Sequence, residues 1–103
     1  MTEQIRTLLE RSIKYHGAKV QAWKAVEELG ELTQALAKLM GDLRAPNPDY
    51  NRMVDHVAEE VADVRITLEQ ILMIFDIEDR AGQWRYEKLK RLKERLDSQE
   101  ARA

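Results

Sequence analysis

The chain has 103 residues, of which 44% are hydrophobic and 35% are charged, and its net charge is −2. This length and composition predict one folded domain rather than a disordered chain. The absence of cysteine excludes disulfides and thiolate metal sites, and no apolar run is long enough to cross a membrane. The N-terminal stretch MTEQIRTLLE is charged and amphipathic, unlike a signal peptide, so we expect a cytoplasmic protein.

Apolar residues recur at helical spacing along the whole chain, and this periodicity predicts an all-α fold. The expected helices cover about residues 2–15, 18–42, 51–76 and 79–97. Gly17 ends the first, the stretch RAPNPDYN at 44–51 forms a surface loop, and an acidic residue in FDIEDRAGQ caps the fourth. The tail after Leu96 is expected to fray. We therefore predict a single domain over 1–103, built as an antiparallel bundle of about four helices.

Two acidic motifs stand out, EELGE at 27–31 and EEVAD at 59–63. On an ideal helix Glu28 and Glu31 lie along one border of the apolar stripe, and Glu60 and Asp63 do the same on the third helix. If these two helices pack antiparallel, the pairs meet, and a hard divalent cation such as Mg²⁺ would offset the repulsion between the carboxylates. The alternative is that both motifs are solvated faces that form salt bridges along their helices.

The two motifs, in this order and on helices, resemble the EExxE…ExxD signature of the MazG-like all-α nucleoside triphosphate pyrophosphohydrolases. The wider strings KYHGAKVQAWKAVEELGELTQAL and EEVADVRITLEQI are similar to the same family, so the resemblance spans about residues 14–96.

That resemblance implies an enzyme that hydrolyses a nucleoside triphosphate to the monophosphate and pyrophosphate, in the manner of a nucleotide-pool housecleaning hydrolase. It implies Mg²⁺, or Mn²⁺, as the cofactor, with the four border acids as ligands. Glu27 would be a further acid beside the reacting water, and Gln21 and Lys24 would face the nucleotide. The residues expected to hold the metal are Glu28, Glu31, Glu60 and Asp63.

Charge is distributed unevenly along the chain. Residues 1–78 carry nine Lys/Arg against fourteen Asp/Glu, a net of −5, whereas residues 79–103 carry eight against five, a net of +3. Lys88 and Arg91, with Arg95 on the same helical face, could contact substrate phosphates or could be solvated charges. A tail of this modest charge on an acidic protein gives no reason to expect nucleic-acid binding.

The third helix also carries a second apolar strip, made of Ala62, Ile66, Met73 and Ile77. A helix that is apolar on two sides must be covered twice, so we expect a homodimer or homotetramer, as the resemblance also implies. One other interpretation stays open at this point: a non-catalytic helical oligomerisation or interaction module whose acidic site is degenerate.

Overall fold

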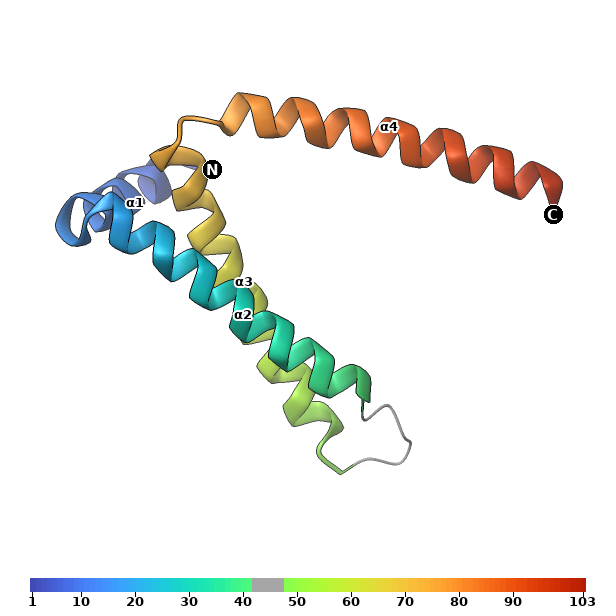
Figure 1. The fold of residues 1–103 in the computed structure, drawn as a ribbon, viewed down its shortest axis with the longest axis horizontal. Coiled ribbons are helices and arrows are strands. Elements are labelled where there is room, and N and C mark those ends of the chain that lie inside the picture. Colours follow the sequence, from blue (N-terminus) through green and yellow to red (C-terminus); the bar gives the residue numbers. More distant parts are fainter. Residues whose placement is uncertain (42–47) are drawn as a thin grey trace.

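The computed structural model describes residues 1–41 and 48–103, and these form four helices (Figure 1). The helices are α1 (Glu3–His16), α2 (Ala18–Gly41), α3 (Tyr50–Ile74) and α4 (Glu78–Arg102). The prediction of an all-α fold is confirmed, since no strand occurs in the described ranges. Residues 44–47, half of the expected loop at 44–51, lie outside the described ranges, and α3 already includes Tyr50 and Asn51. None of the helices is both long and apolar enough to span a membrane.

The ends of α1 follow directly from its sequence. The hydroxyl of Thr2 accepts a hydrogen bond from the backbone N–H of Ile5 at 3.2 Å, which satisfies one of the free donors of the first turn. Gly17 ends the helix with φ at 97°, a value that residues with a Cβ rarely adopt, and its N–H donates to the carbonyl of Ile13. The chain can therefore turn at once into α2.

The centre of the molecule is the antiparallel hairpin of α2 and α3, which lie side by side along most of their length (Figure 1). Ala25 and Ala35 on α2 are small, so the two helices can approach closely, and Val64 of α3 is buried against this line. Helix α1 packs across the end of the hairpin and adds Leu9 to the core. The expected packing of the second helix against the third is confirmed.

A buried polar pair fastens α2 to α3 near the α1 end of the hairpin. The side-chain amide of Gln21 donates to the side-chain carbonyl of Gln70 at 3.1 Å and to the hydroxyl of Ser12 at 2.9 Å. Gln21 and Gln70 are 5% and 3% exposed. Because these groups are removed from water, their mutual hydrogen bonds fix how the helices pair.

Helix α4 stands apart from the other three helices (Figure 1). Its backbone comes close to that of α3 alone, one side-chain ion pair joins its first turn to α1, and none of its residues is buried. The radius of gyration is 17.8 Å, whereas a compact domain of this length has about 13 Å. The four helices of one chain thus do not close into a complete bundle.

The start and end of α4 also differ from expectation. Ile77, not an acidic residue, occupies its N-cap position, and Glu78 and Asp79 lie in its first turn, where they complement the helix dipole. The helix continues to Arg102, well beyond the expected end near residue 97.

Candidate metal centre

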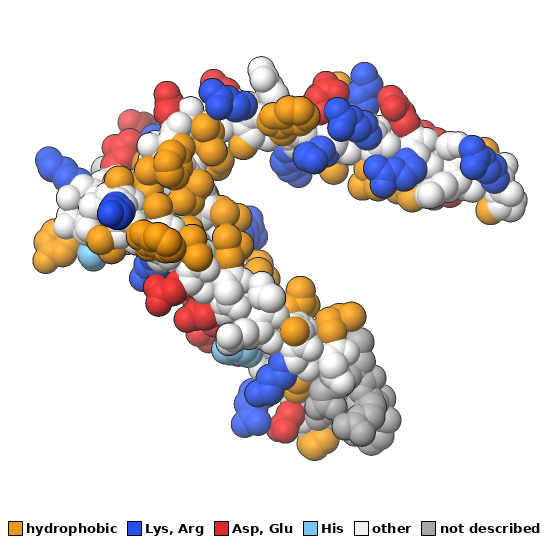
Figure 2. Space-filling model, viewed as in Figure 1, with side chains coloured by type: hydrophobic (Ala, Val, Ile, Leu, Met, Phe, Trp, Pro, Cys, Tyr) orange, Lys and Arg blue, Asp and Glu red, His pale blue; other side chains and the backbone are white. Residues whose placement is uncertain are grey.

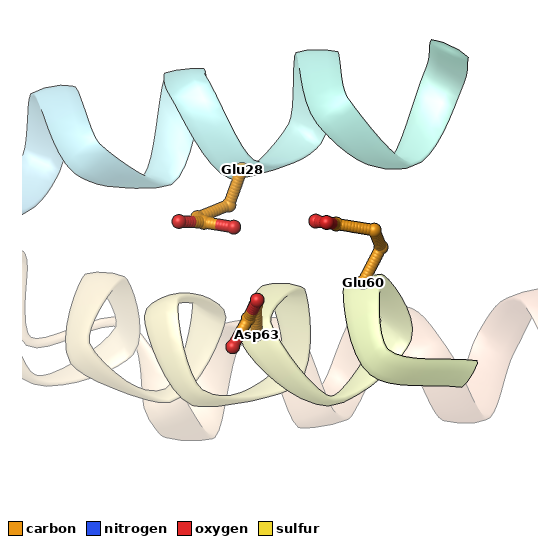
Figure 3. Close-up of side chains that lie close together, drawn as sticks. All are labelled: Glu28, Glu60 and Asp63. Carbon is orange, nitrogen blue, oxygen red and sulfur yellow. The ribbon is translucent and has the colours of Figure 1, made fainter. Parts of the chain in front are cut away.

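Three of the four predicted metal ligands come together between α2 and α3. Glu28 extends from α2 toward α3, while Glu60 and Asp63 extend from α3 toward α2 (Figure 3). One carboxylate oxygen of each lies within 4.8 Å of the other two. Glu60 is buried at 6% exposure, whereas Glu28 and Asp63 are half-buried. We call these three residues the acidic cluster.

Two oxygens of the acidic cluster are buried without a partner. Oε2 of Glu28 and Oε2 of Glu60 are removed from solvent and accept no hydrogen bond. Within the described ranges, the one ion pair of the cluster joins Glu60 Oε1 to His56 Nε2 at 4.0 Å, a contact at the limit of a salt bridge. Buried carboxylate oxygens in native proteins almost always have a partner, so these two require a ligand or a proton.

Burial and mutual repulsion act together on these carboxyl groups. Burial raises the pKa of Glu28, and the charges of Glu31 and Asp63 raise it further. Burial likewise raises the pKa of Glu60, again reinforced by Glu31 and Asp63 and only partly opposed by His56. Without a cation, Glu28 and Glu60 therefore take up a proton more readily than free carboxyl groups do.

The donor set fits a hard divalent cation. Mg²⁺ and Mn²⁺ bind carboxylate oxygens, and Mg²⁺ usually keeps several waters when one or two carboxylates hold it. Three converging carboxylates, two of which have an unpartnered buried oxygen, match this preference and would leave coordination positions for water and substrate. A bound cation would also remove the electrostatic cost of gathering these acids beside the apolar core.

The remaining predicted acids lie outside the acidic cluster. Glu31 is exposed one turn after Glu28 and is not among the three converging residues, but its side chain lies within hydrogen-bonding reach of the Glu28 carboxyl group. Its charge acts on both Glu28 and Glu60. Glu27 is exposed and is also not among the converging three.

The predicted substrate-binding residues are widely separated in one chain. Gln21 is buried in its pair with Gln70, whereas Lys24 is exposed one turn before Glu28. Lys88 and Arg91 are exposed on α4, and α4 makes no contact with α2. Within a single chain the structure thus leaves only Lys24 near the acidic cluster.

A basic cavity lies next to the acidic cluster on the same side of the hairpin. It has a volume of about 430 Å³, and the described residues lining it include Lys38 from α2 and Arg52 and His56 from α3. Asp49 pairs with Arg52 at 3.2 Å, and His56 links the cavity to Glu60. Sequence reasoning missed this cavity, although Arg52, His56 and Glu60 are spaced four residues apart and so share one helical face.

Comparisons with models of protein families, with curated proteins and with solved structures gave no match. The functional argument for this chain therefore depends on its own motifs and on the geometry of the acidic cluster.

Proposed function

We propose that the chain is a Mg²⁺-dependent hydrolase, with Mn²⁺ as a possible substitute, that converts a nucleoside triphosphate to its monophosphate and pyrophosphate. The observation that carries this proposal is the acidic cluster of Glu28, Glu60 and Asp63, with its two unpartnered buried oxygens. The motifs EELGE and EEVAD, which supply those residues, resemble the signature of the MazG-like pyrophosphohydrolases. Geometry and motif thus support the same reaction class.

In this proposal the chain's residues hold and orient the reactants. Glu28, Glu60 and Asp63 would hold the cation, and Glu31, whose charge acts on both Glu28 and Glu60, would be the fourth ligand. When bound, the cation lowers the pKa of a water molecule and neutralises charge on the phosphates. The water would lose a proton and its oxygen would bond to the α or the β phosphorus, while the P–O bond from that phosphorus to the bridging oxygen breaks. The products are the nucleoside monophosphate and pyrophosphate in either case.

The basic cavity supports the binding of a polyphosphate. Lys38 and Arg52 place positive charge in this cavity, so phosphates directed into it would meet cations while the reacting bond lies at the acidic cluster. Lys24, at the other end of the cluster, provides a second cationic contact. Glu27 stays the proposed acid beside the reacting water, on the strength of the motif.

The test is pyrophosphate release from a panel of common, deaminated and oxidised ribo- and deoxyribonucleoside triphosphates with Mg²⁺. We expect turnover of at least one substrate, its loss in Asp63→Asn and Glu60→Gln, and its retention in Glu59→Gln. Glu59 is the matched control because it adjoins Glu60 in sequence but is exposed. If no substrate is hydrolysed, or if Asp63→Asn and Glu60→Gln remain active, the proposal is wrong.

We also propose that the working form is a homodimer or homotetramer located in the cytoplasm, where nucleoside triphosphates are abundant. Support comes from the shortage of buried apolar residues in one chain, in which only Leu9, Ala25, Ala35 and Val64 form the described core. Ile66 from the predicted second apolar strip is half-exposed, as a residue awaiting a partner would be.

The exposed apolar surface equally favours a second candidate function, a helical oligomerisation module without catalysis. Both candidate functions require an oligomer, but only the first requires cation binding and nucleotide hydrolysis. An oligomer that binds no divalent cation and hydrolyses no nucleotide would favour the second.

A further inference from the structure

Helix α4 carries an apolar strip that nothing in its own chain covers. Trp84, Leu89, Leu92 and Leu96 lie on one side of the helix and are between 42% and 54% exposed. An isolated helix is marginal in water, and most helical stability in proteins comes from packing of an amphipathic face. A 25-residue helix of this kind therefore needs a surface to pack on.

The hairpin has an uncovered apolar face whose residues repeat every seven positions, as Leu89 and Leu96 do on α4. Along α3 and its C-cap residue, four apolar residues are spaced seven apart and are each at least 37% exposed: Val54, Val61, Leu68 and Phe75. On α2, Leu29 and Leu36 have the same spacing and are 43% and 44% exposed. Seven-residue spacing keeps apolar side chains along one seam of a packed helix.

These residues of α2 and α3 lie on one side of the hairpin. A shallow apolar hollow bordered by Trp23 and Val26 of α2 and by Ile74 and Phe75 of α3 joins the two helices there. On an ideal helix, Leu29 and Val61 are each turned by about 100° from the neighbouring carboxylates of the acidic cluster. The apolar face and the acidic cluster thus occupy different sides of the hairpin.

The chain does not fold α4 back onto this face. Asp76, with φ at 51°, turns the backbone between α3 and α4, and Arg6 of α1 pairs with Glu78 in the first turn of α4 at 2.7 Å. From this elbow α4 extends away from the hairpin (Figure 1). Hydrophobic side chains are visible along the edges of both α4 and the hairpin that border the open angle between them (Figure 2).

We propose that α4 of each copy docks on the apolar α2–α3 face of a second copy, so that two chains exchange their last helices. The lengths agree, since α4 has 25 residues and α2 and α3 have 24 and 25. The charges also agree, because residues 79–103 carry +3 and residues 1–78 carry −5. Each copy has one uncovered apolar strip on α4 and one uncovered apolar face on its hairpin. In a two-fold dimer the α4 of each copy would cover the hairpin face of the other, so that both surfaces are buried in both copies. This inference does not depend on the proposed reaction.

A charge substitution in the apolar strip tests whether α4 holds the copies together. Light scattering of the intact chain should show a dimer or a larger even assembly, and Leu92→Glu should weaken self-association by at least about tenfold. Gln83→Glu is the control, because it adds the same charge on the opposite side of α4, and it should leave the assembly unchanged. A monomeric intact chain, or equal effects of the two substitutions, would overturn the proposal.

A cross-linking experiment keeps the proposal testable even if Leu92→Glu unfolds the chain. Leu92 is replaced by the photo-reactive residue benzoyl-phenylalanine in ¹⁵N-labelled chains, which are refolded with unlabelled wild-type chains. We expect cross-links from labelled α4 to unlabelled peptides that contain Leu29, Leu36, Val61 or Leu68. Cross-links confined to the labelled chain itself, or running only from α4 to α4, would refute helix exchange.

Discussion

The buried pair of Gln21 and Gln70 gives a prediction that separates a structural role from a substrate-binding role. Gln21→Leu keeps the side-chain volume similar but removes both hydrogen bonds that the Gln21 amide donates, to Gln70 and to Ser12. Each lost bond costs about 0.5–1.5 kcal/mol, and the Gln70 carbonyl left buried without a donor adds about 1–3 kcal/mol. Ser12 is half-exposed, so water can replace its partner. We therefore expect a loss of about 2–4 kcal/mol in the free energy of unfolding.

The assay is a double-mutant cycle in urea at fixed protein concentration. Replacing both residues, Gln21→Leu with Gln70→Leu, removes donor and acceptor together and should restore stability to within about 1 kcal/mol of wild type. Gln34→Leu, at an exposed position of α2, is the matched control and should change stability by less than about 0.5 kcal/mol. If Gln21→Leu leaves stability intact and weakens nucleotide binding instead, our structural assignment of Gln21 is wrong and its predicted role at the substrate is right.

Two further predictions concern stability. Because burial and the charges of Glu31 and Asp63 raise the pKa of Glu28 and Glu60 above the ordinary 4.5, the folded chain holds protons that the unfolded chain releases. The free energy of unfolding of the metal-free chain should therefore fall as the pH rises from 4.5 through the raised pKa values. The measurement is the urea midpoint in EDTA as a function of pH, which should fall less steeply in Glu60→Gln than in wild type. Identical pH profiles of the two proteins would contradict this prediction. Gly17→Ala should destabilise the chain by at least about 1 kcal/mol in thermal unfolding, because φ is 97° at this position, and an unchanged melting temperature would show that the turn relaxes.

The hairpin and its helix boundaries could be predicted because local signals determine them. Gly17 marks the turn between the first two helices, and the apolar period carries α2 and α3 to within two residues of their described ends. Sequence periodicity does not distinguish a face buried in the chain from a face that awaits a partner. Val61, Leu68 and Phe75 follow the apolar period expected of a core face, whereas the structure leaves them partly exposed.

The sequence predicts four metal ligands on the second and third helices, and the structure brings carboxylate oxygens of three of them within 4.8 Å of one another. Both acid pairs lie at the edge of an apolar stripe, yet their burial differs: Glu60 is buried and Asp63 is half-buried. On α2, Glu28 is half-buried, whereas Glu31, turned by about 60° from it, is exposed. Which carboxylate of each pair is buried depends on the rotation of the helix about its own axis. Packing between segments that are distant in the sequence sets that rotation.

The separation of α4 could not be predicted from local patterns. Its direction depends on the left-handed backbone of Asp76 and on the contact between Arg6 and Glu78, which are 72 residues apart. Neither an Asp at a helix end nor two exposed charges signals such an elbow in sequence.

The central claim, that Glu28, Glu60 and Asp63 together bind a divalent cation, is tested most directly by calorimetric titration of the metal-free chain with Mn²⁺. We expect saturable binding to wild type, an affinity reduced by at least about tenfold in Glu60→Gln, and unchanged binding in the adjacent, exposed control Glu59→Gln. Absence of binding to wild type, or equal affinities in all three proteins, would contradict it.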